Sequence, residues 1–220
     1  MYHSEIAGTV KPKRPYNSAR RHAQAQATRR VILEVAQRLF VTDGYVATTI
    51  EGIAAEAGVS AKTVYDAFAT KPGVLRGVWD LALKGDTDDA PVEARPWFVQ
   101  VLEEPDPARM VKLIAHNSVV VKQRIGPVLR VIRAASSVDD DSAALWALIQ
   151  SDFHANQRVL IDAIAKRKGL KVGLSVDRAA DILWTLNHPD TWLALHYERR
   201  WSAKEFETWL AATLAQQLLK

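Results

Sequence analysis

The side chains whose types and spacing best suit a defined chemistry lie between residues 61 and 71, in the stretch AKTVYDAFATK. Lys62 supplies a cation, Thr63 a hydroxyl and Tyr65 a phenol. These groups donate hydrogen bonds to phosphate oxygens and to the edges of bases in a DNA groove. Lys71, directly before a proline, adds a charge that suits a phosphate. The pattern therefore predicts a surface for contact with nucleic acid.

Two short helices joined by a tight turn are expected to position these groups. Thr48 and Glu51 have the spacing of a capping box at the start of the first helix. Gly58 suits the left-handed position that ends this helix, and Ser60 is placed to cap the second one. The sequence therefore predicts a helix-turn-helix.

The second helix of this unit has an apolar side and a polar side. Val64 and Phe68 lie four residues apart, so both face the core. The opposite side is then turned toward solvent or a ligand. The residues expected on it are Ala61, Lys62, Thr63 and Tyr65.

Along this region the chain resembles the TetR family of bacterial one-component repressors. The matching positions are Ile32, Ala36, Leu39, Phe40, Gly44, Tyr45, Thr48, Thr49, Ile53, Ala54, Ala57, Gly58, Val59, Ser60, Thr63, Tyr65, Phe68, Lys71 and Leu75. The resemblance implies contacts with operator DNA from Thr49, Lys62, Thr63, Tyr65 and Lys71. Asp66 departs from the family, which more often has a basic or polar residue there. An acid this close to phosphates is expected to weaken binding or to point along a gap between the DNA strands.

Positive charge is concentrated at the N-terminus of the chain. The whole chain carries +4, whereas its first thirty residues hold seven Lys or Arg and one Glu, so the remaining 190 residues sum to about −2. The seven basic residues are Lys11, Lys13, Arg14, Arg20, Arg21, Arg29 and Arg30. DNA is the natural partner of such an arm, with Arg20 and Arg21 as candidate contacts. A solvated, disordered tail is the alternative.

The chain divides into four expected segments. Residues 1–22 are expected to form a flexible basic arm, 23–71 a three-helix helix-turn-helix domain, 72–84 a connecting helix and 85–220 a second, helical domain. Within that domain a linker with one short helix precedes helices near 106–122, 124–136, 140–168, 176–187, 190–199 and 203–219, with breaks at Gly126–Pro127, Gly169–Gly173 and His188–Pro189. No strand-like alternation is evident, so the fold class is all-α.

The C-terminal half resembles the effector-binding and dimerisation domain of actinobacterial-like TetR-type regulators. The phrases GLSVDRAADILWTLNHPDTW and RRWSAKEFETWLAATLAQQLL carry that resemblance. It implies that the last two long helices form a four-helix interface with a second subunit. The candidates for this seam are Leu183, Leu186, Trp192, Leu193, Trp209, Leu210, Leu214 and Leu218. The same residues also suit the chain's own core.

A small-molecule pocket is expected in the central helices. Apolar walls with a few polar groups are typical of such pockets. The candidate lining residues are His116, Asn117, Trp146, Gln150, Phe153, His154 and Trp184. Each of them also suits an ordinary core or surface position.

Several other kinds of protein are disfavoured. The chain has no cysteine, which excludes disulfides and Cys-based zinc sites. His188 and His196 are eight residues apart, about 12 Å along a straight helix and too far to share one ion with Asp190. The acidic run 139–141 is better explained by helix capping. Neither a metal nor a cofactor is therefore expected.

Enzymatic and membrane functions are disfavoured as well. The sequence contains no nucleophile elbow and no Gly-rich phosphate loop, so catalysis is not expected. No apolar run approaches the roughly 20 residues of a membrane span, and the first thirty residues lack the apolar core of a signal peptide. A cytoplasmic protein is therefore expected.

These observations together favour a homodimeric, sequence-specific transcriptional regulator, in the first place a repressor. A small apolar or amphipathic effector would release it from a near-palindromic operator. The alternative is a helical small-molecule-binding or protein-interaction module that has no specific DNA binding. That alternative predicts weak DNA association with little dependence on salt.

Overall fold

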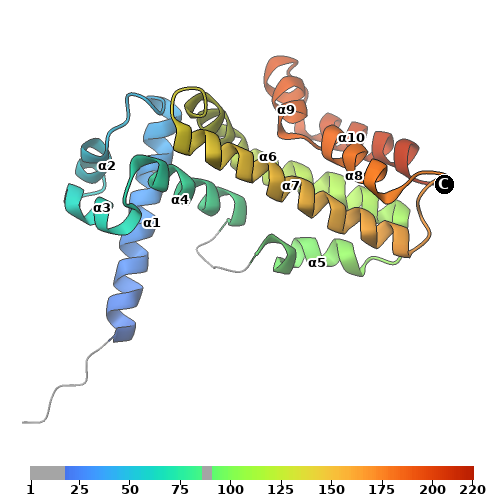
Figure 1. Cartoon of the computed structure of the whole chain (residues 1–220), viewed down its shortest axis with the longest axis horizontal. Coiled ribbons are helices and arrows are strands. Elements are labelled where there is room, and N and C mark those ends of the chain that lie inside the picture. Colours follow the sequence, from blue (N-terminus) through green and yellow to red (C-terminus); the bar gives the residue numbers. More distant parts are fainter. Residues whose placement is uncertain (1–17, 86–90) are drawn as a thin grey trace, which may run out of the picture.

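The computed structural model of the chain describes residues 18–85 and 91–220. The described chain is helical throughout (Figure 1), which confirms the expected all-α class. The helices are α1 (Ser18–Thr42), α2 (Ile50–Glu56), α3 (Ala61–Phe68), α4 (Lys71–Lys84), the 3-10 turn η1 (Val92–Ala94), α5 (Pro96–Glu103), α6 (Pro107–Ala135), α7 (Asp140–Lys166), α8 (Val176–Leu186), α9 (Pro189–Trp192), the π-helical segment η2 (Leu193–Glu198) and α10 (Ala203–Leu218). None of the helices in these two ranges is long and apolar enough to cross a bilayer.

Helix starts follow local capping chemistry. The Ser60 hydroxyl accepts a hydrogen bond from the Thr63 amide, as expected, and Ser175 caps α8 in the same way. Ser202 and Glu205 form a complete capping box at the start of α10. Asp139 caps α7, which confirms that the acidic run serves the helix start.

The expected cap of α2 was wrong by one residue. Thr49, not Thr48, is the N-cap, and its hydroxyl accepts from the Gly52 amide at 3.0 Å. Thr48 is buried instead, and its hydroxyl donates to the Gly44 carbonyl at 2.8 Å. Both residues have capping chemistry, and the path of the chain from Gly44 decides which of them faces the helix end.

The expected break at Gly126–Pro127 is also wrong. α6 runs without interruption for 29 residues, with Pro127 in its interior. A proline there costs a backbone hydrogen bond. Ile125, Val128 and Leu129 are buried around it, so tertiary packing on both sides of the proline maintains the helix. Near the C-terminus, by contrast, the expected helix over 190–199 changes from α9 to the π-helical η2.

The first helix begins earlier than expected. α1 starts at Ser18, so Arg20 and Arg21 lie on a helix and not in an arm that ends at residue 22. Lys11, Lys13 and Arg14 lie outside the described residues.

Two hydrophobic clusters hold the helices together. The first joins α1–α4 to the second half of α6 and to Leu145 and Ile149 of α7. The second joins α5, the first half of α6 and the later part of α7 to α8, α9 and α10. α6 and α7 therefore cross both clusters, and Figure 1 shows them running from the α1–α4 end of the molecule to the opposite end.

Most of the expected seam residues belong to the chain's own core. Leu183, Trp192, Leu210, Leu214 and Leu218 are at most 1% exposed. They are buried by contacts of α10 with α6 and α8, so they are not available to a second subunit, and their assignment to the seam is corrected. Leu186, Leu193 and Trp209 remain partly exposed.

The close contact of α4 with α1 and α3 gives a test of this packing. A Cβ atom on Gly77 would lie 2.8 Å from Leu33 Cδ2 and 3.0 Å from Phe68 Cε1. Gly77→Val should therefore lower the free energy of unfolding by about 1–3 kcal/mol, the usual cost of overpacking. Chemical denaturation measures it, with Ala144→Val at an exposed α7 position as the control. Equal stability of the two variants would contradict the packing.

Candidate DNA interface and ligand pocket

α3 presents its polar side to solvent because its apolar side is anchored. Val64 is fully buried and Phe68 nearly so, whereas Tyr65 is 47% exposed. Lys62 is exposed, and Ala61 and Thr63 are partly exposed on the same side of the helix. Burial of the two apolar residues fixes the rotation of the helix, so the structure brings these polar groups together on one outward face.

Lys62 and Asp66 form an ion pair on this face. The Lys62 ammonium lies 2.6 Å and 2.9 Å from the two carboxylate oxygens of Asp66, one helical turn away. Their side chains are 80% and 64% exposed, so water screens the pair and it adds little stability. A phosphate that binds Lys62 must compete with this carboxylate.

Two of the expected DNA contacts have internal partners. The Lys71 ammonium donates to the carbonyls of Tyr45 (2.8 Å) and Thr48 (3.0 Å), and it lies 4.2 Å from the centre of the Tyr45 ring. Lys71 therefore fastens the turn between α1 and α2 to the start of α4. Thr49, as the cap of α2, already accepts one hydrogen bond through its hydroxyl, whose proton remains free to reach a phosphate.

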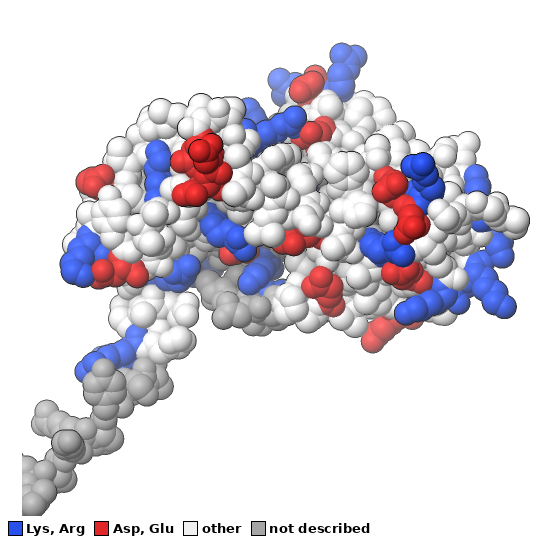
Figure 2. Space-filling model, viewed as in Figure 1, with Lys and Arg blue, Asp and Glu red and all other residues white. Residues whose placement is uncertain are grey.

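Basic residues of α1 differ in their roles. Arg29 donates to the Ala67 carbonyl at 2.6 Å, and its guanidinium lies 4.0 Å from the centre of the Phe68 ring, so it ties α1 to the end of α3. Arg30 pairs with Glu34. Arg20 and Arg21 lie on the exposed first turn of α1. Figure 2 shows basic side chains near this end of α1 and, mixed with acidic ones, over the helix-turn-helix.

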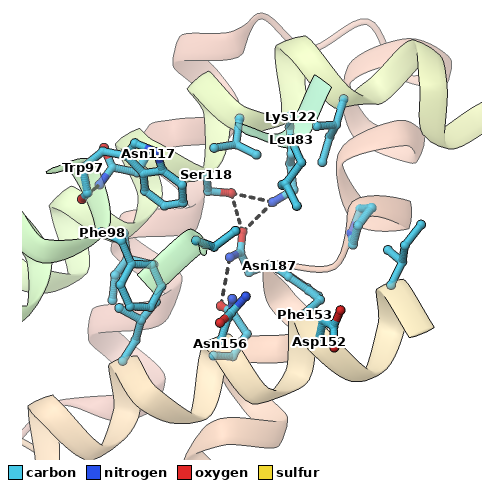
Figure 3. Close-up of a pocket in the computed structure, with 18 of the residues that line it drawn as sticks. Leu83, Trp97, Phe98, Asn117, Ser118, Lys122, Asp152, Phe153, Asn156 and Asn187 are labelled. Atoms are coloured by element: carbon cyan, nitrogen blue, oxygen red, sulfur yellow. Dashed lines mark hydrogen bonds between the residues drawn. The ribbon is translucent and has the colours of Figure 1, made fainter. Parts of the chain in front are cut away.

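A cavity of about 130 Å³ lies among α4, α5, α6 and α7. Most of its wall is apolar and much of it aromatic, and Figure 3 shows Trp97 and Phe98 on one side with Phe153 across from them. The lining residues are Trp79, Leu83, Val92, Trp97, Phe98, Val101, Ile114, Asn117, Ser118, Val121, Lys122, Ile125, Ile149, Asp152, Phe153, Asn156, Gln157, Leu160, Asn187 and Pro189. Such a lining suits a small, largely apolar molecule.

A polar cluster interrupts the apolar wall. Lys122 Nζ lies 2.5 Å from both Ser118 Oγ and Asn187 Oδ1, and the Ser118 hydroxyl also donates to Asn187. Asn187 in turn donates to Gln157 Oε1 at 3.0 Å. Figure 3 shows Ser118, Lys122 and Asn187 pointing toward one another. The four side chains, which we call the Lys122 network, join α6, α7 and the residue that follows α8.

The Lys122 network holds an amine in an unusual environment. Lys122 is only 3% exposed. Burial lowers the pKa of its ammonium well below the ordinary value for lysine, because the charged form loses its hydration. The network supplies neutral hydrogen-bond acceptors in place of water.

Residues 32–78 match the sequence pattern of the bacterial regulatory proteins of the tetR family. The match covers the helix-turn-helix region of the chain, and it supports the expected resemblance of this region to the TetR family. No curated protein is significantly similar to it in sequence.

Solved structures share the fold of this chain. NalD of Pseudomonas aeruginosa, the secondary repressor of the MexAB-OprM multidrug efflux pump, is 20% identical, with a TM-score of 0.68 over 90% of this chain and 98% of NalD. A Saccharomonospora viridis protein assigned as a transcriptional regulator, in complex with choline, is 18% identical, with a TM-score of 0.65 over 88% and 98%. The SmeT–triclosan complex is 19% identical, with a TM-score of 0.65 over 89% and 93%.

Only two of the seven expected pocket residues line the cavity. Phe153 contributes to the wall, and Asn117 does so while donating to the Trp97 carbonyl at 2.8 Å, which ties α6 to α5. His116 is exposed, and its Nδ1 lies 3.5 Å from Glu207 Oε2. Trp146 packs beside the first hydrophobic cluster.

The remaining three expected residues form a separate group between α7 and α8. Gln150 Oε1 lies 2.6 Å from His188 Nε2, and the His188 ring lies 4.8 Å from the Trp184 ring. His154 contacts Asp181 and also lies against Trp184. This group stands outside the cavity, because Gln150 and His154 occupy another face of α7 than the lining residue Phe153, and Trp184 lies on α8.

The sequence analysis missed the Lys122 network. Its signal was nonetheless present, since Ile114, Ser118, Lys122 and Ile125 recur at helical spacing on one buried stripe of α6. Polar residues on an apolar stripe mark either a satisfied core network or a binding site.

Metal-ligating side chains do not gather in the described ranges. No group of three or more His, Asp or Glu residues there could hold an ion. His188 caps α9, and the His196 ring is stacked on Trp192 with a centroid distance of 4.2 Å.

The depressed pKa of Lys122 predicts a pH dependence of stability. Below the ordinary lysine pKa of about 10.4, the unfolded chain binds a proton that the folded chain holds weakly, so stability rises with pH in this range. Lys122→Met removes that contribution. Between about pH 7 and pH 10, the variant's free energy of unfolding should therefore increase less than that of the wild type. Denaturant titrations at several pH values measure this difference, with exposed Lys166→Met as the control. The expectation is contradicted if the free energy of unfolding of Lys122→Met and of the wild type changes equally with pH.

Proposed function

We propose that this chain is a homodimeric transcriptional repressor that a small apolar or amphipathic molecule releases from operator DNA. The observation that carries the proposal is the position of α4. This helix follows the helix-turn-helix directly and also supplies Trp79 and Leu83 to the cavity wall. One helix therefore contacts both the helix-turn-helix and the cavity.

The outward face of α3 supports the DNA-binding part of the proposal. Lys62, Thr63 and Tyr65 can donate to phosphates and base edges, and Ala61 is small enough to allow close approach. We expect Arg20 and Arg21, on the exposed first turn of α1, to contact the phosphate backbone as well. Lys71 and Arg29 act as positioning residues, because their donors fix the turn and the end of α3.

The cavity supports the effector part. Two of the similar structures contain small organic molecules, choline in one and triclosan in the other. A ligand here would touch α4, α5, α6 and α7 at once. It shifts the equilibrium only if it binds the DNA-incompetent arrangement more tightly than the competent one.

The proposed homodimer matches an operator whose two halves form an inverted repeat. Two copies related by a twofold axis would place their α3 helices roughly 34–36 Å apart, one turn of DNA. The partly exposed apolar side chains Leu186 of α8 and Trp209 of α10 are available for this contact.

Selection of genomic DNA fragments followed by fluorescence anisotropy tests the proposal. The wild type should enrich fragments that share an inverted repeat. Tyr65→Phe should weaken binding by roughly 0.5–2 kcal/mol, since it removes one phosphate donor. Lys62→Ala should reduce the salt slope by about one. Val172→Ala, at a 93% exposed position outside the helices, is the control. Weak, sequence-indifferent binding by all four proteins would favour the helical binding module instead.

The Lys62–Asp66 ion pair predicts a gain of affinity. Asp66→Asn frees the Lys62 ammonium and removes a like charge from the phosphate-facing side, so DNA binding should tighten roughly 2- to 10-fold, with a steeper dependence on salt. Anisotropy titrations at two salt concentrations measure this effect. Asp181→Asn on α8 is the control, and the expectation is wrong if both variants bind DNA like the wild type.

A further inference from the structure

The cavity wall contains a buried amine that has no acidic partner among the residues that the structure describes. In its charged form Lys122 Nζ has three hydrogens to donate, and the structure gives it two neutral oxygen acceptors, Ser118 Oγ and Asn187 Oδ1. No carboxylate of residues 18–85 or 91–220 lies within 4.0 Å of it, and burial alone accounts for its depressed pKa. A buried lysine is normally paired, because an unpaired buried charge is costly.

The surrounding network keeps the amine in place. Asn187 donates its amide hydrogen to Gln157, so its oxygen faces Ser118 and Lys122. All three partners are themselves buried. Three separate parts of the chain thus position one donor at the edge of an apolar cavity, which is an arrangement that suits recognition of an oxygen acceptor on a ligand.

The dimensions and lining of the cavity define the rest of the ligand. A dry cavity of about 150 Å³ holds a benzene molecule, and the present cavity measures about 130 Å³. Trp79, Trp97 and Phe153 offer aromatic surfaces to a ring. Space and chemistry therefore fit one ring with a single small polar group.

We propose that the cavity binds a ring-sized, apolar monocarboxylate whose carboxylate accepts hydrogen bonds from Lys122. The inference rests on the proposed function only in taking this cavity as the effector site. The bound carboxylate supplies the counter-charge that the Lys122 network lacks. The nearby anion favours the charged form of the amine, so Lys122 takes up a proton from solvent as the carboxylate binds. The pair then forms a buried, charge-assisted hydrogen bond, which is stronger than a neutral one.

A second charged residue at the cavity would favour a ligand of the opposite charge. Asp152 also lines the cavity, and it would attract a cationic ligand. Its side chain is exposed, however, so water and salt screen its field, whereas the Lys122 amine acts in a desolvated environment. The anionic ligand is therefore favoured over the cationic one.

Isothermal titration calorimetry of the full wild-type chain, without DNA, tests the proposal directly. The probes are benzoate, benzamide and benzylammonium, which share a ring and differ in the charge of the polar group. Benzoate should bind at least about tenfold more tightly than benzamide, as expected for a hydrogen bond to a charged group. Equal or tighter binding of benzamide or benzylammonium would overturn the proposal, as would a lack of binding by all three probes.

A pair of lysine variants assigns the preference to one residue. Lys122→Met should abolish the preference for benzoate while retaining benzamide binding. Lys166→Met, which removes an exposed lysine of α7, should leave the preference intact. A benzoate preference that survives in folded Lys122→Met overturns the role of Lys122. If that variant does not fold, the comparison of the three probes on the wild type decides the matter.

Failure of this inference is separable from failure of the proposed function. If the wild type selects operator fragments but shows no preference for benzoate, the proposed repressor function is supported and the proposed monocarboxylate ligand is rejected. If benzoate binds through Lys122 but no operator is selected, the proposed ligand site is supported and the proposed DNA-binding function is rejected.

Discussion

Burial of one face of α4 is the constraint on which the rest of the structure depends. Val74 and Leu75 are fully inaccessible to solvent, and the helix contacts α1, α3, α6 and α7. It therefore belongs to the core of the helix-turn-helix and to that of the long helices at once. Packed interiors transmit small displacements and do not absorb them. The helix-turn-helix therefore cannot shift relative to the cavity wall unless α4 moves. The fold itself thus links the two candidate sites.

Stability and ligand recognition make opposite demands on the second hydrophobic cluster. An apolar residue at position 122 would pack without desolvating a charge, whereas the lysine must be supported by a set of buried hydrogen bonds. The same helix also contains Pro127, whose missing amide costs another hydrogen bond. Departures of this kind from simple core packing are expected where a protein uses its interior for binding. The structure offsets both costs by packing α6 against most of the other helices.

The DNA-facing helix shows a related compromise. α3 is only eight residues long, so it cannot be stable alone, and Val64, Phe68 and the contact with Arg29 fix its position. Its exposed side is then free to carry polar groups, but Lys62 and Asp66 neutralise each other there. The polar groups of α3 therefore offer DNA less net positive charge than their positions alone would suggest. Under the proposed function, specific contacts, more than bulk attraction, would carry the recognition of an operator by α3.

The sequence by itself determined the helical class, the helix-turn-helix, its family and most helix starts, because capping and apolar periodicity act within a few residues. Tertiary structure alone decided which of two adjacent threonines caps α2, because the path of the chain before them matters. It also decided that α6 continues through Pro127, since burial on both sides outweighs the lost hydrogen bond. Membership of the cavity depended on how α4–α7 pack together, so five of seven expected residues lie elsewhere. The sequence places Ser118 and Lys122 on one apolar stripe, but only the tertiary structure brings Asn187, 69 residues from Ser118, into contact with them.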